Sequence, residues 1–301
     1  MQDIRIAAIS SHSKFGDTCA NLANILGCID DAAAAKATLV CFAELALQGY
    51  GADRQRMRDL AEPADGPSCR AIHDRARRHN LIVSFGMSLA VDEKVYNSNV
   101  LIGPDGVLGV SHKIHTSGTD ALFDQANDWP VFDIGKCKLG VLICRDACLP
   151  ESARILALKG AEVVIICFAS GRLDCRGQLQ DPLLWSEQVL RWTPARAFDN
   201  GLYVVGVNQA GDISDPDGIA EARCADEHGL HRWPGYSFAI APDGSILAES
   251  DRTHNRQRML VVDLSVVLRQ QSRSRFLYER RPDTYGDLVS TELPPHTRTP
   301  K

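Results

Sequence analysis

The chain has 301 residues, of which 45% are hydrophobic and 24% charged, as is typical of a soluble globular protein with a substantial core. A formal net charge of −5, without any block of like charges, argues against a nucleic-acid-binding surface. No apolar run reaches the roughly 18–20 residues of a membrane span, and the N-terminus lacks the features of a signal peptide. Ten cysteines without a Cys-x-x-Cys pair indicate a reducing, cytoplasmic setting with neither a disulfide framework nor a zinc site.

Apolar, β-rich runs alternate with helical patterns along most of the chain, which predicts an α/β layered fold. The expected strands cover 4–10, 37–45, 81–90, 139–144, 162–170 and 202–209. The expected helices cover 18–36, 69–80, 150–161 and 183–200. The stretch 211–234 has no clear period, is rich in Asp and Gly, and is expected to be a surface loop near the functional site.

Two segments interrupt this alternation and resemble each other: "YNSNVLIGPDGVLGVSHK" (96–113) and "GYSFAIAPDGSILAES" (235–250). Each is predicted to be a hairpin, since proline and glycine favour a tight turn at the shared Pro-Asp-Gly. One hairpin in each half indicates one domain of two pseudo-equivalent halves with mixed sheets. We expect a single domain over 1–268, followed by an Arg- and Pro-rich extended arm over 269–301 that packs on the domain or on a partner subunit.

Three residues suited to catalysis lie at the ends of predicted strands. Glu44 ends "TLVCFAE", Lys113 ends the first hairpin, and Cys144 ends "LGVLIC" just before a sharp turn into a helix. Taken singly, Glu44 and Lys113 are as well explained by exposed strand ends, and one cysteine among ten is more often inert. A nucleophile on a strand–turn–helix elbow, however, is lifted toward backbone N–H groups that can bind an oxyanion.

The order and spacing of these segments resemble the nitrilase superfamily of carbon–nitrogen hydrolases nearly from end to end. The three signature segments are "LVCFAELALQGY", "SHKIH" and "LGVLICRDACLPE", and supporting matches include "YNSNVLIGPDG" and "RRPDTYGDL". The resemblance implies a four-layer α-β-β-α sandwich with two mixed sheets, assembled as a homodimer or higher homo-oligomer. It also implies a Glu–Lys–Cys site that acts on a small-molecule amide without a metal or organic cofactor.

The resemblance assigns a role to each site residue. Cys144 is expected to attack the substrate carbonyl and form a thioester, while Glu44 serves as general base. Lys113 is expected to stabilise the oxyanion together with the backbone N–H of Arg145. Ala169 is a further candidate oxyanion-binding or substrate-binding residue.

The sequence departs from the family pattern between the lysine and the cysteine, where many members carry a second glutamate. This stretch has no glutamate, so Asp120 is the nearest candidate for that role, ahead of Asp124. The residues after the nucleophile favour an amide substrate, because Ala147 and Cys148 occupy positions where carbamoyl hydrolases often carry arginines. N-carbamoyl compounds, nitriles, acyl transfer to an amine and a catalytically silent binding role remain alternatives.

Overall fold

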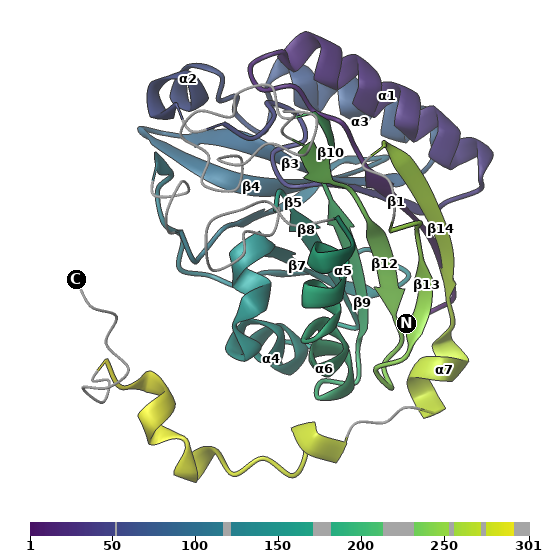
Figure 1. Cartoon of the computed structure of the whole chain (residues 1–301), viewed down its shortest axis with the longest axis vertical. Helices are drawn as coiled ribbons and strands as arrows, with labels where there is room; N and C mark the ends of the chain where they lie inside the picture. Colours follow the sequence, from purple (N-terminus) through teal and green to yellow (C-terminus); the bar gives the residue numbers. More distant parts are fainter. Residues whose placement is uncertain are drawn as a thin grey trace.

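Two six-stranded mixed sheets form the centre of the protein in a computed structural model, which describes residues 1–51, 53–116, 122–170, 182–212, 232–252, 256–271 and 275–291 (Figure 1). The first sheet has the order β14 (Arg258–Leu264), β1 (Ile4–Ser10), β2 (Leu39–Phe42), β3 (Ile82–Val91), β4 (Lys94–Gly103) and β5 (Gly106–His112). The second has the order β13 (Ile246–Glu249), β12 (Ser237–Ile240), β9 (Tyr203–Asn208), β8 (Val163–Phe168), β7 (Lys138–Ile143) and β6 (Val131–Asp133).

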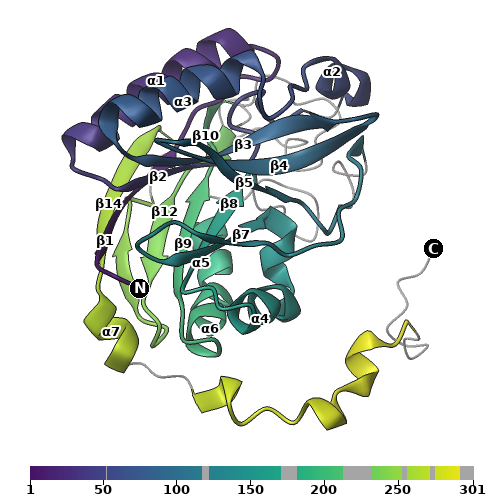
Figure 2. The same ribbon diagram turned by 180° about the vertical axis from the view of Figure 1, so that it is seen from behind.

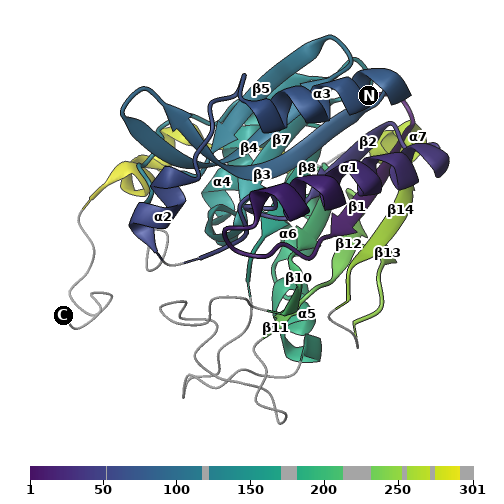
Figure 3. The ribbon, with the colours of Figure 1, turned by 90° about the horizontal axis from the view of Figure 1, so that it is seen from above.

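Helices cover the outer face of each sheet. α1 (Thr18–Ala34) and α3 (Pro67–His79) lie side by side over the first sheet, and α2 (Arg54–Asp59) lies near one end of it (Figure 3). α4 (Pro150–Leu158), α5 (Pro182–Leu190) and α6 (Thr193–Phe198) cover the second sheet (Figure 2). The predicted four-layer α-β-β-α sandwich is therefore confirmed.

Three groups of buried side chains correspond to the three interfaces between these layers. One group joins α1 and α3 to the first sheet, and another joins α4, α5 and α6 to the second. The third lies between the sheets, where Ile6 and Cys41 of the first pack with Val141 and Ile165 of the second. Both sheets thus have two covered faces, which explains why their central parallel strands are continuous apolar runs rather than alternating ones.

Both Pro-Asp-Gly segments form antiparallel hairpins, β4–β5 and β12–β13. Gly106 and Gly244 have φ values of 130° and 84°, the positive range that glycine tolerates best. The ends of the predicted 211–234 loop instead form a small sheet of β10 (Ala210–Asp212) and β11 (Arg232–Pro234). The rest of that segment, 213–231, lies outside the described residues.

The predicted single helix over 183–200 is wrong, because α5 and α6 are separate helices that break at Arg191 and Trp192. Pro194 accounts for the break, since its ring and missing N–H are tolerated only in the first turn of a helix. Thr193 stabilises the junction by donating from Oγ1 to the carbonyl of Val189 at 2.8 Å.

The chain leaves the sandwich after β14 through α7 (Val266–Gln271). The short 3-10 turns Arg275–Leu277, Pro282–Thr284 and Gly286–Val289 follow, and they extend along one side of the body in Figure 1. This segment leaves large apolar side chains exposed, among them Tyr278 (90%), Leu288 (65%) and Val289 (85%). Within the described ranges, no helix is long and apolar enough to span a membrane.

Candidate active site

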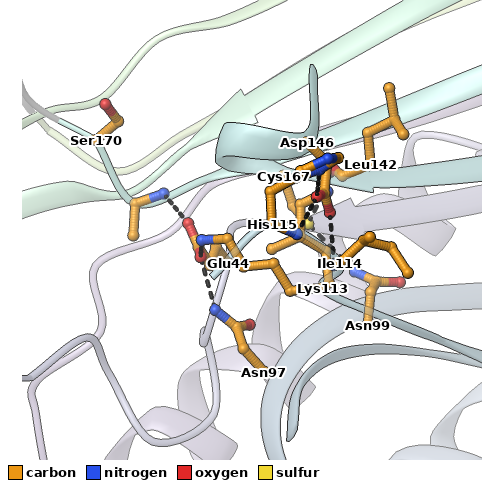
Figure 4. A network of polar contacts seen from close by, with 12 residues as sticks. Glu44, Asn97, Asn99, Lys113, Ile114, His115, Leu142, Asp146, Cys167 and Ser170 are labelled. Carbon is orange, nitrogen blue, oxygen red and sulfur yellow. Dashed lines mark hydrogen bonds and ion pairs between the residues drawn. The ribbon is translucent and has the colours of Figure 1, made fainter. Parts of the chain in front are cut away.

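Glu44 follows β2 and is fully buried between the two sheets. Its Oε1 accepts hydrogen bonds from Asn97 Nδ2 and Lys113 Nζ, both at 2.7 Å, and its Oε2 accepts one from the backbone N–H of Ala169 at 2.9 Å (Figure 4). A buried carboxylate is stable only when it is paired and hydrogen-bonded in this way. The donors also fix the orientation of the carboxylate.

The backbone beside Glu44 is packed closely against β3. Leu45 has a φ of 51°, unusual for a branched side chain, and Leu47 donates its N–H to the carbonyl of Gly86 at 3.1 Å. A side chain at Gly86 would overlap the Leu45 backbone nitrogen and lie 2.6 Å from the Ala43 oxygen. Gly86 is therefore needed for β3 to approach the turn that carries the glutamate.

Lys113 directly follows β5 and is 1% exposed. Its backbone N–H donates to the carbonyl of Asn97 at 2.8 Å, which continues the β4–β5 ladder by one residue. Glu44, Asn97 and Lys113 therefore meet at one end of the first sheet, where β2 and β5 end and β4 begins. The interpretation of Glu44 and Lys113 as exposed strand ends is wrong, because both are buried and paired with each other.

Cys144 directly follows β7 and begins a 3-10 turn, Cys144–Cys148, that precedes α4. Its φ of 48° is in the left-handed region, which costs an L-residue free energy and is found at functional turns. Its side chain is half-buried, at the junction of the core between the sheets and the core beneath α4. The structure thus contains the predicted strand–turn–helix elbow, with a strained backbone at the cysteine.

β8 connects this elbow to the Glu44 carboxylate. Ile143 pairs with Cys167 on β8, and Phe168, the next residue, accepts a hydrogen bond from the Glu44 N–H at 3.3 Å. Ala169 follows and donates to Glu44 Oε2. The cysteine turn and the glutamate–lysine pair therefore meet at the same end of the two packed sheets, where β2, β5, β7 and β8 end.

Asp146 links the cysteine turn to the lysine segment, a role that the sequence analysis did not assign. The side chain is 1% exposed. Its Oδ1 accepts from the backbone N–H and Nδ1 of His115, both at 2.8 Å, and its Oδ2 accepts from the N–H groups of Ile114 and Ile143, both at 3.4 Å (Figure 4). One carboxylate thus fixes the chain on both sides of the site.

Arg196 holds the other end of the cysteine turn. From α6, its Nη2 donates to the carbonyl of Cys148 at 2.9 Å and its Nε to that of Ala147 at 3.3 Å. These carbonyls end a short helical turn, where a cation is favourable. Burial lowers the pKa of the guanidinium, but arginine remains charged in proteins.

Burial makes the other cysteines in this region poor nucleophiles. Burial raises the pKa of the Cys41 thiol to about 12 and that of Cys167 well above its ordinary value, with the Glu44 charge adding to the effect at Cys167. Burial also raises the pKa of Cys148, although Arg145 and Arg196 act in the opposite direction. A thiol with a raised pKa forms little thiolate near neutral pH.

The remaining candidate residues have mixed outcomes. Asp120 lies outside the described residues. Asp124 accepts from Arg58 at 3.1 Å and from the Val95 N–H at 2.8 Å, so it is committed to those partners. Arg145 has an exposed side chain. The N–H of Ala169 binds Glu44, so this residue holds the carboxylate in place.

Within the described ranges, no group of three or more His, Cys, Asp or Glu side chains is arranged to hold a metal ion. The donors around Glu44 are nitrogen groups, which stabilise an anion and do not ligate a cation.

Known proteins resemble this chain over most of its length. The model of the carbon–nitrogen hydrolase family matches residues 5–273. The chain is 28% identical to an (R)-stereoselective amidase from a Pseudomonas species, over 97% of this chain and 96% of the relative. It is 27% identical to a nitrilase from Pyrococcus abyssi, over 88% and 91%. The crystal structure of a carbon–nitrogen hydrolase from Helicobacter pylori G27 has the same fold, with a TM-score of 0.82 at 23% identity, over 97% of this chain and all of that one.

Proposed function

This chain belongs to the carbon–nitrogen hydrolase family, as its resemblance to the nitrilase superfamily predicts, and we propose that it hydrolyses the C–N bond of a small linear amide through Cys144. One observation carries the proposal. A fully buried carboxylate–ammonium pair, Glu44 and Lys113 at 2.7 Å, lies at the same end of the sheets as the Cys144 elbow. Burying such a pair is costly, so a fully buried charge pair of this kind is a candidate functional site.

The chemistry follows from these positions. Glu44 takes the thiol proton of Cys144, and the thiolate attacks the amide carbonyl carbon. Lys113 and the Arg145 N–H stabilise the tetrahedral oxyanion. The C–N bond then breaks as Glu44 returns the proton to the leaving nitrogen, which leaves an acyl thioester. Water, deprotonated by Glu44, attacks the thioester, and the acid and the free thiol are released.

The residues that follow Cys144 favour an amide substrate over the alternatives. Carbamoyl substrates rank second. Ala147 is fully buried and Cys148 carries no charge, so neither side chain can bind the carboxylate of an N-carbamoyl amino acid. Nitriles are the third candidate, and a nitrilase is among the relatives. A catalytically silent binding protein has no need for the buried Glu44–Lys113 pair. In this proposal Asp120 takes the place of the second glutamate and orients Lys113.

The decisive experiment is ammonia release from a panel of amides, ureas and nitriles, combined with intact-protein mass spectrometry for the thioester. Cys144→Ala is expected to lower turnover by more than about a thousandfold and to abolish the adduct. Cys148→Ala, the matched control in the same turn, is expected to retain most activity. Full activity of the Cys144→Ala protein would refute the mechanism. An acyl-amine product in the presence of added amines would identify acyl transfer.

We further propose that the single domain over 1–268 works in the cytoplasm as a homo-oligomer and that the arm over 269–301 contributes to the subunit contact. The exposed apolar side chains of Tyr278, Leu288 and Val289 support this role for the arm. Light scattering on the full chain and on a Leu288→Ser/Val289→Ser variant tests this role. The variant is expected to dissociate at a higher protein concentration than the wild type.

A further inference from the structure

Asn97 carries a buried acceptor next to the proposed general base. The residue is 1% exposed, and its Nδ2 donates to Glu44 Oε1 at 2.7 Å. Since a carboxylate only accepts, the amide nitrogen must face Glu44 and the carbonyl oxygen must face away from it. That oxygen, Oδ1, has no hydrogen-bond partner among the residues that the structure describes.

A neighbouring asparagine shows what an ordinary buried amide does in this strand. Asn99 lies two residues further along β4, on the same face, and is fully buried. Its Oδ1 accepts from Ser84 Oγ at 2.7 Å, and its Nδ2 faces Cys167 Sγ at 3.8 Å. Within the described residues, Asn99 is satisfied at both ends, whereas Asn97 is satisfied only at the end that contacts Glu44. An unpaired buried acceptor is unfavourable unless a ligand or water supplies the donor.

Gln209 provides a second comparison. Its Nε2 donates to the main-chain oxygen of Glu44 at 2.7 Å, and its Oε1 is likewise without a partner in the described part of the chain. Gln209 therefore contacts the backbone of Glu44, and Asn97 contacts the carboxylate. Of the two unpaired acceptors, only that of Asn97 belongs to a side chain bound to the carboxylate that exchanges protons with the substrate.

From this geometry we infer that Asn97 Oδ1 accepts a hydrogen bond from an N–H of the leaving nitrogen, which makes Asn97 a specificity-determining residue for primary amides. The inference rests on the proposed function. The leaving nitrogen must reach Glu44 to receive its proton, and this places it beside the amide group of Asn97. A primary amide carries two N–H bonds, so one can face Oδ1. An N-methylamide has one such bond fewer, and a nitrile has none.

The discriminating test compares substrates that share an acyl group and differ only at nitrogen. Acetamide, propionamide, butyramide and benzamide are each paired with the corresponding N-methylamide, and kcat/KM is measured for the wild type and for Asn97→Leu. Leucine has a similar size and no acceptor. The ratio of primary to N-methyl kcat/KM is expected to fall by about tenfold, the usual effect of one hydrogen bond. Asn99→Leu, the matched control on the same strand, is expected to lower the melting temperature and leave the ratio unchanged.

A second measurement covers the case in which Asn97→Leu does not fold. In a crystal of the Cys144→Ala protein with propionamide, the amide nitrogen is expected about 2.7–3.2 Å from Asn97 Oδ1. A crystal in which Oδ1 retains a water, or in which no amide lies beside it, contradicts the inference, as does an unchanged ratio in a folded Asn97→Leu protein. If the wild type releases ammonia from no amide, the proposed function itself fails, and the two failures are thereby distinguished.

Discussion

The two sheets repeat one topology but carry very different side chains at equivalent places. After β5, the N–H of Lys113 donates to the carbonyl of Asn97 at 2.8 Å. After β13, the N–H of Ser250 donates to the carbonyl of Ser237, also at 2.8 Å. The backbones of the two hairpins therefore end in the same way. The first hairpin ends in an amide and a cation directed at Glu44, and the second ends in two hydroxyl side chains.

The ends of β2 and β8, which occupy equivalent places in the two sheets, correspond as well. Glu44 is the second residue after β2 and Ala169 is the first after β8, and the two segments face each other, since the Ala169 N–H binds the Glu44 carboxylate. Cys144 follows β7, whereas Ser11, fully buried, follows β1. Each half thus offers the same strand ends, and the charged pair comes only from the first half while the thiol comes only from the second. The comparison indicates that the site depends on a few side chains placed on a backbone frame that occurs twice.

Replacing Lys113 is expected to have the largest effect among the changes that test this comparison. Lys113→Met removes the ammonium and leaves Glu44 as an uncompensated buried charge, which costs about 3–5 kcal/mol of stability. Amide turnover is expected to fall by about 10²–10³-fold through loss of oxyanion stabilisation. Ser250→Ala, at the equivalent place in the second half, is expected to leave turnover within about twofold, because a change outside the site has little effect on it. Equal losses in the two variants, measured by steady-state kinetics and denaturant unfolding, would show that the two sheet ends are functionally alike.

A smaller effect is expected from Asp146→Asn, which tests how the two halves are joined. Asparagine keeps the shape, but its NH₂ group faces N–H donors and cannot accept their hydrogen bonds. The cysteine turn and the lysine segment should then shift relative to each other, with kcat lowered by about 10–100-fold and KM changed much less. Asp133→Asn is a suitable control, because among the described residues that exposed carboxylate accepts only from the local Gly135 N–H at 2.9 Å. Unchanged kcat in a folded Asp146→Asn protein would contradict the role of Asp146.

Local sequence patterns predict the layers, both hairpins and the elbow at Cys144. The spacing of hydrophobic residues and the Pro-Asp-Gly turns determine these features within a few residues of sequence. The positions of Glu44 and Lys113 at strand ends are also visible from the sequence, but their burial is not. Each was equally compatible with solvent exposure, and it is the packing of one sheet on the other that joins them.

The roles of Asn97, Asp146 and Arg196 could not be predicted, because each depends on a partner from a distant segment. Asp146 bonds with His115, 31 positions away, and Arg196 bonds with Cys148, 48 positions away. A weak signal existed in "YNSN", where polar side chains interrupt an otherwise apolar strand, and in Asp146, an acidic residue two positions after Cys144. Such residues are best read as partners of a buried site.

A change in packing alone tests how closely β3 must approach the Glu44 turn. Gly86→Ala places a methyl group against the Leu45 nitrogen and the Ala43 oxygen, so a loss of about 1–3 kcal/mol of stability is expected, with a reduced kcat as Glu44 is displaced. Gly27→Ala makes the same substitution in the interior of α1, where a new Cβ has no atom within 4 Å. It is expected to stabilise the protein by about 0.5–1 kcal/mol. Thermal unfolding measures the melting temperature of both variants. Equal changes in melting temperature would contradict the close approach of β3 to the Glu44 turn.

The smallest expected effect concerns His112, which precedes Lys113 and corresponds to Glu249 in the second hairpin. His112 stacks on Tyr96, with ring centroids 4.4 Å apart, and its Nδ1 lies 2.7 Å from Ser98 Oγ. Glu249 instead accepts from the Tyr236 hydroxyl at 2.6 Å. The two hairpins therefore place a tyrosine beside a basic group in one case and an acidic group in the other.

Burial lowers the pKa of His112 below its ordinary value of 6.5. The folded protein then binds fewer protons here than the unfolded chain, so the stability contribution of neutral His112 is complete above about pH 6.5 and is lost as the pH falls through the lowered pKa. His112→Phe keeps the stacking and cannot titrate, so its free energy of unfolding is expected to decline less than that of the wild type when the pH is lowered from about 7 to about 5. Urea unfolding at several pH values measures both slopes. If the free energy of unfolding falls equally with pH in the two proteins, the pKa of His112 is not lowered by folding. The tyrosine contacts of the two hairpins would then respond to acid in the same way.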